Sequence, residues 1–156
     1  MNELTEVKTV DLIGPALDWA VAKAAGWVLA RIVAIETPSK TYYEIHAPSG
    51  LELRPSSDWA QGGPLIQSWQ IFIDPPHDVH RANYDEKTGK VKGCWQTYES
   101  WHATVSARVC TTPPKVPGFP GGVGRGEGET PLIAICRAII AAKLGATVQI
   151  PKELLP

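Results

Sequence analysis

The side chains best suited to bind a polar molecule lie in one short string, RPSSDWAQGGPLI, from Arg54 to Ile66. It offers hydroxyls, a carboxylate, an indole and an amide in close succession, and its two glycines let a ligand approach the backbone. We expect a recognition loop for a flat, polar molecule. The residues that we expect to contact the ligand are Ser57, Asp58, Trp59, Gln61, Gly62 and Gly63. The alternative is a side-chain-capped turn that only organises the loop.

A second candidate site lies where a glycine-rich run, Gly121–Gly128, leads into Thr130-Pro131. The free amides at a helix start attract anions. We therefore expect Thr130 to lie beside an anionic ligand, with Arg125 at the charged tip of a lid. The run matches neither the dinucleotide fingerprint nor the P-loop. The alternative is a mobile linker, the usual role of such composition.

Two further side chains complete the candidate binding set. Arg137 lies two helical turns after Thr130 on a face of small residues, and a guanidinium binds phosphate or carboxylate with two parallel hydrogen bonds. Its alternative role is that of a surface cation. Trp19 follows an acidic residue, as Trp59 does, and we expect it to stack on the ligand. The alternative for both tryptophans is core packing.

Catalytic and metal-binding patterns are missing from the sequence. There is no GxSxG elbow, and spacing alone assembles no serine–histidine–aspartate set. His77 and His80 lie in a proline-rich stretch without the further ligands that zinc requires. We therefore expect no enzyme, no metal and no cofactor. A hydrolase that acts on a phosphorylated substrate through His77, His80 or His102 is the weakest alternative.

Two helices must position these groups, and both have their ends written in the sequence. Gly14-Pro15 opens the first and Gly26 ends it, while Thr130-Pro131 opens the second and Gly145 ends it. A short helix is expected over Pro64–Trp69, after a loop from Arg54 to Gly63. The predicted strands are residues 28–35, 42–46, 71–73, 94–110 and 147–150.

Two further segments are predicted to be a surface excursion and a flexible loop. Residues 74–93 are polar and rich in turn formers, so we expect a surface excursion. Residues 111–129 are rich in proline and glycine and are expected to form a flexible loop. The chain is then one α+β domain, residues 1–156, with a mostly antiparallel sheet and two main helices packed on it.

The composition of the chain limits the kinds of partner that we expect. A net charge of −1 gives no reason to expect nucleic acid. Three widely spaced cysteines indicate reduced thiols, no apolar run approaches the ~20 residues of a membrane span, and the N-terminus is too polar for a signal peptide. We expect a soluble intracellular protein that contacts no membrane. The small-residue face beside Arg137 leaves room for a neighbouring subunit, so a homo-oligomer is compatible with the sequence.

Three segments carry a family resemblance. They are LIGPALDWAVAKAAG (residues 12–26), PSSDWAQGGPLI (55–66) and TPLIAICRAIIAAKLGATVQIPKEL (130–154). In order and spacing they resemble the NinX-like family of small proteins from tailed bacteriophages and prophages, a domain of unknown function. The chain departs from the family pattern in residues 74–92 and in the proline- and glycine-rich loop, which look expanded.

The resemblance implies a phage origin and a location in the host cytoplasm, but no activity. Small accessory phage proteins often counter host defence, and some sequester nucleotide immune signals. By analogy, we expect an accessory protein that binds a small nucleotide-like ligand without turnover. The alternative is a protein-interaction factor that inhibits or modifies a host enzyme through an aromatic surface.

Overall fold

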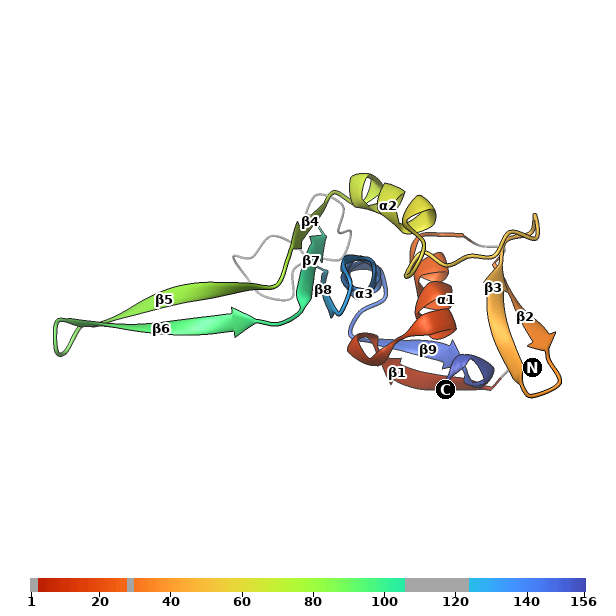
Figure 1. Ribbon diagram of the computed structural model, residues 1–156, viewed down its shortest axis with the longest axis horizontal. Coiled ribbons are helices and arrows are strands. Elements are labelled where there is room, and N and C mark those ends of the chain that lie inside the picture. Colours follow the sequence, from red (N-terminus) through yellow and green to blue (C-terminus); the bar gives the residue numbers. More distant parts are fainter. Residues whose placement is uncertain (1–2, 28–29, 106–123) are drawn as a thin grey trace.

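Helix α3 (Pro131–Lys143) lies at the centre of the molecule. In the computed structural model, which describes residues 3–27, 30–105 and 124–156, it contacts α1 (Gly14–Ala24), α2 (Trp59–Ser68) and one small sheet (Figure 1). Its buried leucine, isoleucine, alanine and cysteine side chains form most of one core cluster together with those of α1. The α+β prediction is confirmed.

The described strands pair only in antiparallel fashion, and they form four small sheets rather than one. The sheets are β1 (Leu4–Lys8) with β9 (Thr147–Pro151), β2 (Arg31–Glu36) with β3 (Thr41–His46), β4 (Ile71–Asp74) with β7 (Trp101–Val105) and β8 (Arg125–Gly128), and β5 (His77–Asp85) with β6 (Lys90–Tyr98). Short 3-10 turns at Thr9–Asp11 and Lys152–Leu154 flank the terminal pair.

The ends of α1 and α3 form as their sequences predict. The hydroxyl of Thr130 accepts a hydrogen bond from the Ile133 amide at 3.2 Å, which satisfies one free donor of the first turn. Pro15 and Pro131 occupy the first turns of their helices. Gly26 and Gly145 follow the last turns with φ of 79° and 101°, where a side chain would be strained.

The glycine-rich run does not form a lid in the part that the structure describes. Arg125–Gly128 is strand β8, paired with β7, so the predicted flexible loop does not reach residue 129, and Arg125 is not at a loop tip. Gly126 faces α3 so closely that a Cβ would collide with the backbone of Ala134 and Ala138. Glycine is needed here for close packing of strand and helix. Residues 111–123 of the predicted loop lie outside the described residues.

The segment that was predicted as a recognition loop is partly helical. Helix α2 begins at Trp59, so the loop ends at Asp58 rather than Gly63, and Pro64 lies inside the helix instead of opening it. The carboxylate of Asp58 accepts a hydrogen bond from the Ala60 amide at 2.9 Å. The N-cap therefore precedes the glycines, and α2 runs through them.

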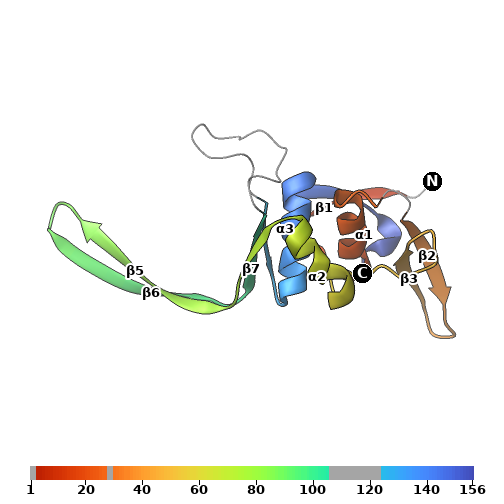
Figure 2. The same cartoon turned by 90° about the horizontal axis from the view of Figure 1, so that it is seen from above.

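The predicted surface excursion is exposed, and it belongs to a long β-ribbon. Strands β5 and β6 continue away from the β4–β7 pair and project from the body (Figures 1 and 2). Asp74 pairs with His102, and His77 pairs with Tyr98. Two residues (75 and 76) lie between these pairs on one side of the ribbon, and three (99–101) lie between them on the other. This one-residue offset resembles a bulge, a feature that bends a ribbon.

Candidate functional site

A cleft of about 360 Å³ opens where three segments meet. The start of α1 forms one wall, β3 forms a second, and the extended chain that leads to α2 forms the third. The lining residues are Gly14, Pro15, Asp18, Tyr42, Tyr43, Glu44, Ile45, Glu52, Leu53, Arg54, Ser56, Ser57 and Ile133. Aromatic rings and polar groups thus share one concave surface, as in sites for small molecules.

Asp18 is the most perturbed acid of the cleft. Its side chain is only 5% exposed, because α1 buries most of its residues against α3 and β3. Its Oδ1 accepts a hydrogen bond from the Ser56 amide at 2.8 Å. Burial raises the pKa of Asp18 from 3.8 to about 6, and the hydrogen bonds from Ser56 oppose that rise. Asp18 can therefore both accept and donate hydrogen bonds near neutral pH.

The remaining charges of the cleft are mostly negative. Glu44 contacts the Nε2 of His46 at 2.8 Å, and Glu52 lies 3.4 Å from the Nε of Arg54. Arg54 is the only cation among the described lining residues, against three carboxylates. A polyanion would be repelled here. The lining suits a ligand that brings hydrogen-bond donors and few negative charges.

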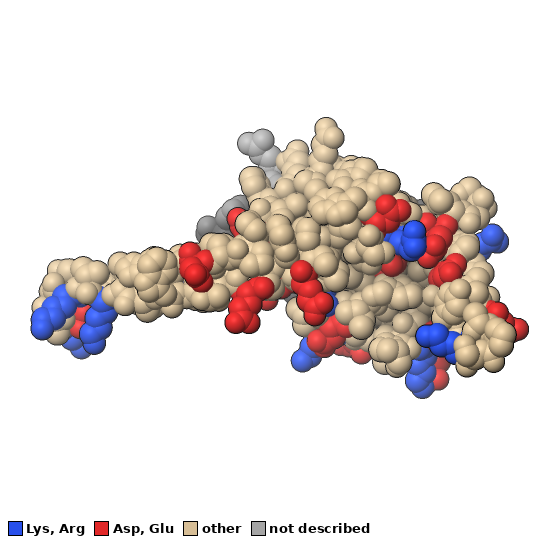
Figure 3. Space-filling model, viewed as in Figure 1, with Lys and Arg blue, Asp and Glu red and all other residues tan. Residues whose placement is uncertain are grey.

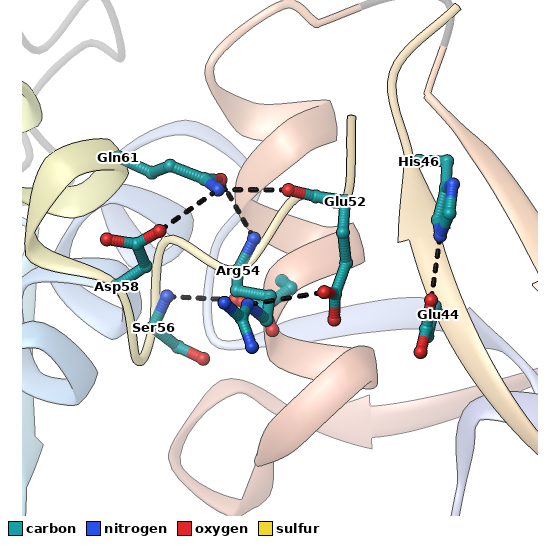
Figure 4. A network of polar contacts seen from close by, with 8 residues as sticks. Glu44, His46, Glu52, Arg54, Ser56, Asp58 and Gln61 are labelled. Atoms are coloured by element: carbon teal, nitrogen blue, oxygen red, sulfur yellow. Dashed lines mark hydrogen bonds and ion pairs between the residues drawn. The ribbon is translucent and has the colours of Figure 1, made fainter. Parts of the chain in front are cut away.

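Gln61 and Asp58 hold the third wall in place (Figure 4). The Gln61 side chain accepts a hydrogen bond from the Arg54 amide and donates one to the Glu52 carbonyl, both at 2.9 Å. It also donates to Asp58 at 3.4 Å. The polar groups of this string therefore organise the chain, as the capped-turn alternative predicts. Ligand contact by Asp58 and Gln61 stays a prediction.

The other predicted residues of this string differ in position. Ser57 lines the cleft. Trp59 is 55% exposed on α2 and is free to contact another molecule. A Cβ on Gly62 would collide with the carbonyl oxygen of Pro55 and with Leu132, so its small size serves packing within the chain. A Cβ on Gly63 would lie 3.6 Å from the Trp59 ring, which is ordinary contact.

Trp19 is buried, with 9% exposure, and belongs to the core cluster. The Nζ of Lys23 lies 4.2 Å from its ring centroid, a cation–π contact between neighbouring turns of α1. Core packing therefore describes this residue better than stacking on a ligand does.

Arg137 is neither a free surface cation nor an open anion receptor. Its Nη2 and Nε donate to the Leu12 carbonyl at 2.9 and 3.3 Å, and its Nη1 donates to the Glu127 carbonyl at 2.7 Å. Partial burial lowers the pKa of its guanidinium. Arg137 thus ties β8 to the segment that precedes α1, a role that its sequence position does not indicate.

The predicted binding residues do not converge on one place. All of them lie in the described part of the chain, yet only Ser57 lines the cleft, while Arg125, Thr130 and Arg137 lie around β8 and α3. Asp18 and the Tyr42-Tyr43 pair were not among the binding residues predicted from the sequence. An acid on the alanine-rich face of a helix was the available signal for Asp18.

The predicted catalytic alternatives find little support in the geometry. His77 stacks on Tyr98 at 5.4 Å between ring centroids, and Tyr98 meets the ring of His102 edge-on at 5.1 Å. None of these rings lines the cleft. Burial strongly raises the pKa of the Cys136 thiol, so this group is inert. Across residues 3–27, 30–105 and 124–156, no group of three potential ligands is placed to hold a metal ion.

Comparison with protein families gives a match. The family model described as "Bacteriophage P22, NinX" matches residues 8–109. This range contains every lining residue of the cleft except Ile133 and the whole β5–β6 ribbon, but not residues 130–154. No curated protein matches the chain significantly. Within the described residues, no helix is long and apolar enough to cross a membrane.

Proposed function

The chain belongs to the NinX family of bacteriophage P22, and from this premise we propose that it is a phage accessory protein that captures a small nucleotide-like ligand without turnover. The cleft beside Asp18 is the proposed site. We further propose that capture occurs in the host cytoplasm and withdraws a nucleotide signal of host immunity, so that the protein acts as an anti-defence sponge.

The observation that carries this proposal is the combination of size and lining. A volume of about 360 Å³ falls at the lower end of the range typical of small-molecule sites. Tyr42 is 38% exposed at the cleft, so its ring can stack on a planar base. Ser56, Ser57 and Asp18 supply hydrogen-bonding groups for the base and the sugar.

The charges of the cleft favour a particular kind of nucleotide. Asp18, Glu44 and Glu52 are unfavourable for a triphosphate, whereas their oxygens accept hydrogen bonds from amino groups and ribose hydroxyls. Arg54 is the cationic group available to a phosphate. We therefore place the nucleoside part in the cleft, with few phosphates directed toward Arg54.

Capture without turnover is supported by the groups around the two serines. A serine nucleophile needs an adjacent base, and the described lining contains no histidine or lysine. The carboxylate of Asp18 accepts hydrogen bonds from both the amide and the side chain of Ser56. Asp18 thereby holds Ser56 in place, and we propose that this hydroxyl orients a ligand and does not act as a nucleophile.

The test is retention of a ligand from a panel of nucleosides, mononucleotides, cyclic dinucleotides and ADP-ribose-type nucleotides. The purified protein is incubated with each compound, desalted and heated, and the released compound is identified by chromatography. Recovery of intact ligand is expected. Recovery of an altered compound would make the protein an enzyme, and retention of none would remove the proposal.

A matched pair of tyrosine variants locates the site. Tyr42→Ala should abolish retention, because the stacking ring is lost. Tyr84→Ala removes a more exposed ring, which belongs to the ribbon, and should leave retention unchanged. Equal losses in both variants would exclude the cleft as the binding site.

A second candidate function is inhibition or modification of a host enzyme by direct contact. One observation favours it: the ribbon exposes Trp95 and Tyr84, at 72% and 65%, far from the cleft. Aromatic side chains of this kind are enriched at the centres of protein interfaces. The second function is the correct one if the protein retains no nucleotide and if Trp95→Ala abolishes its inhibition or modification of the host enzyme in an infected host.

A further inference from the structure

The two edges of the β5–β6 ribbon differ in how they are protected. Exposed strand edges are usually blocked by lysine, proline or a bulge, because their free N–H and C=O groups recruit other strands. Strand β6 carries Lys90 and Lys92, which disfavour pairing with another strand. Figure 3 shows basic side chains gathered at the tip of the ribbon. Strand β5 has no lysine or proline, and its nine residues pair with β6 without a bulge. The β5 edge is therefore the one open to pairing.

The ribbon also lacks the support that such strands need. A two-stranded hairpin is only marginally stable in water, whereas three or more strands with an apolar face are stable. The register places six uncharged residues on one face of this ribbon: His80, Ala82, Tyr84, Val91, Gly93 and Trp95. Val91 is 63% exposed, as are the aromatic rings to a similar degree. The ribbon has an apolar face but too few strands.

Symmetry limits how β5 could pair with β5 of a second copy. Antiparallel strands related by a two-fold axis place residues of the same face opposite each other. Arg81 and Asp85 share one face, and Asp78 lies on the other. Asp78 can therefore lie opposite neither Arg81 nor Asp85 of the partner. A register that places any charged residue of β5 opposite itself brings like charges together. Only one symmetric register brings opposite charges together. When the axis passes through Asn83, Arg81 of each chain lies opposite Asp85 of the other.

We propose that two copies of this chain pair through β5, antiparallel and centred on Asn83, to form a four-stranded sheet. The pairing covers residues 81–85 of each chain, and the self-complementary charges fix its register. The occupant of the edge is a second copy because β5 carries both charges in the order that pairing with itself requires. This inference is independent of the ligand proposed for the cleft.

The charged groups remain able to make these contacts within the folded ribbon. The Nη2 of Arg81 donates to the hydroxyl of Tyr98 at 2.9 Å, and its other guanidinium donors stay available. One carboxylate oxygen of Asp85 accepts the Lys87 amide at 2.9 Å. The carboxylate also accepts hydrogen bonds from Thr88, and a carboxylate has about four acceptor sites, so one is left for the partner's Arg81.

Pairing would also extend the apolar face. Tyr84 would lie opposite the partner's Ala82, and the aromatic residues of both ribbons would form one continuous strip across four strands. Because the ribbon projects from the body, the two tips can overlap while the bodies remain at opposite ends (Figure 2).

Charge reversal gives a sharp test by sedimentation equilibrium of the full chain at low salt. In a symmetric dimer of the Arg81→Glu variant, two contacts between acidic residues replace the two contacts between Arg81 and Asp85. In a dimer of the Asp85→Arg variant, two contacts between arginines replace them. Each variant alone should therefore dimerise about tenfold more weakly than the wild type. An equimolar mixture of the two variants restores both attractive contacts and should recover the wild-type dimer. A wild-type protein that stays monomeric, or a mixture that does not recover, overturns the proposal.

Two controls separate charge from folding. Asp78→Arg makes the same charge change on β5 but outside the paired residues, and should leave the dimer unchanged. Asp85→Asn keeps a side chain that can form the turn at Lys87 and should weaken the dimer less than Asp85→Arg does. A loss of dimer in Asp78→Arg equal to that in Asp85→Arg contradicts the register.

Cross-linking tests the axis directly. In a Cys94→Ser background, Asn83→Cys should form a disulfide-linked dimer on mild oxidation, since directly opposed strand residues lie within disulfide distance. Tyr84→Cys lies opposite the partner's Ala82 and should cross-link far less. Equal cross-linking at both positions would show a contact without this register.

Discussion

At the scale of the residue, Asp18 stands out because α1 would be more stable without its charge. The carboxyl lies in a helix whose other buried members are apolar, and it keeps the hydrogen bond from Ser56. An asparagine could accept that bond without ionising. A buried acid with a strongly shifted pKa at the edge of a cleft is typical of functional sites.

Stability should therefore depend on pH through Asp18. Its pKa is raised from 3.8 to about 6 in the folded protein, so the neutral form favours folding below pH 4, and this contribution is lost as the pH rises through 6. The full difference is about 3 kcal/mol. In urea unfolding at pH 8, Asp18→Asn should be more stable than the wild type by up to that amount. At pH 4 the difference should vanish.

Ligand retention should change in the opposite direction. Asp18→Asn keeps the shape of the cleft but cannot offer a carboxylate, so we expect weaker capture of the nucleotide from a more stable protein. A variant that is stabilised at pH 8 and binds as well as the wild type would show that Asp18 has no part in the site.

We now expect Arg137 and Thr130 to contribute to the stability of the folded protein. Arg137→Ala leaves the Leu12 and Glu127 carbonyls without their donor and should cost about 1.5–3 kcal/mol in unfolding free energy. Arg137→Lys should restore only part of it, since lysine lacks the planar fork.

Thr130→Ala should cost about 1 kcal/mol as a lost helix cap. The measurement is thermal melting with and without the retained ligand. Equal losses in both melts assign Thr130 to capping, whereas a larger loss with ligand would restore the anion site at the start of α3.

At the scale of the element, β8 and α3 meet through glycines on one side of the strand. Gly126→Ala should destabilise the protein by about 1–3 kcal/mol, because the added methyl group meets the backbone of α3. Arg125→Ala, the neighbouring exposed position, should change stability by less than about 0.5 kcal/mol. Urea unfolding of both variants measures the contrast, and similar values would mean that β8 does not pack as described.

The sequence predicted those helices whose first and last residues carry their own start and stop signals. The caps and stops of α1 and α3 are of this kind, and both helices form where Pro15 and Pro131 indicate. The same reasoning placed the start of α2 at Pro64 rather than Trp59, because Gly62-Gly63 suggest a loop, while packing against α3 and the Asp58 cap keep a helix there. Tertiary contact overrode propensity there.

The cleft could not be predicted in this way. Its walls come from α1, β3 and residues 52–57, and only the packing of these segments brings Asp18 beside Ser56 and Tyr42. The polar string from Ser56 to Gln61 was correctly identified as unusual, but much of its chemistry is used to hold the wall.

At the scale of the whole molecule, the body and the ribbon should be separable. Strands β4 and β7 pair directly, and the ribbon leaves the body beyond their ends. Replacing residues 75–100 with a short glycine-containing turn should leave a folded protein that retains the same nucleotide but does not dimerise. Light scattering and the retention assay measure the two properties. Loss of the fold would show that the body depends on the ribbon.

This separation has a consequence for how such a chain can change over time. Adding two residues to each strand, or removing two from each, lengthens or shortens the ribbon. Such a change keeps Trp95 and Tyr84 on their face, because side chains alternate with a period of two. An insertion in one strand alone would form a bulge and turn that face. The ribbon can thus be resized in paired steps while the core around α3 keeps its sequence, so length variation between relatives should concentrate between Asp74 and Trp101.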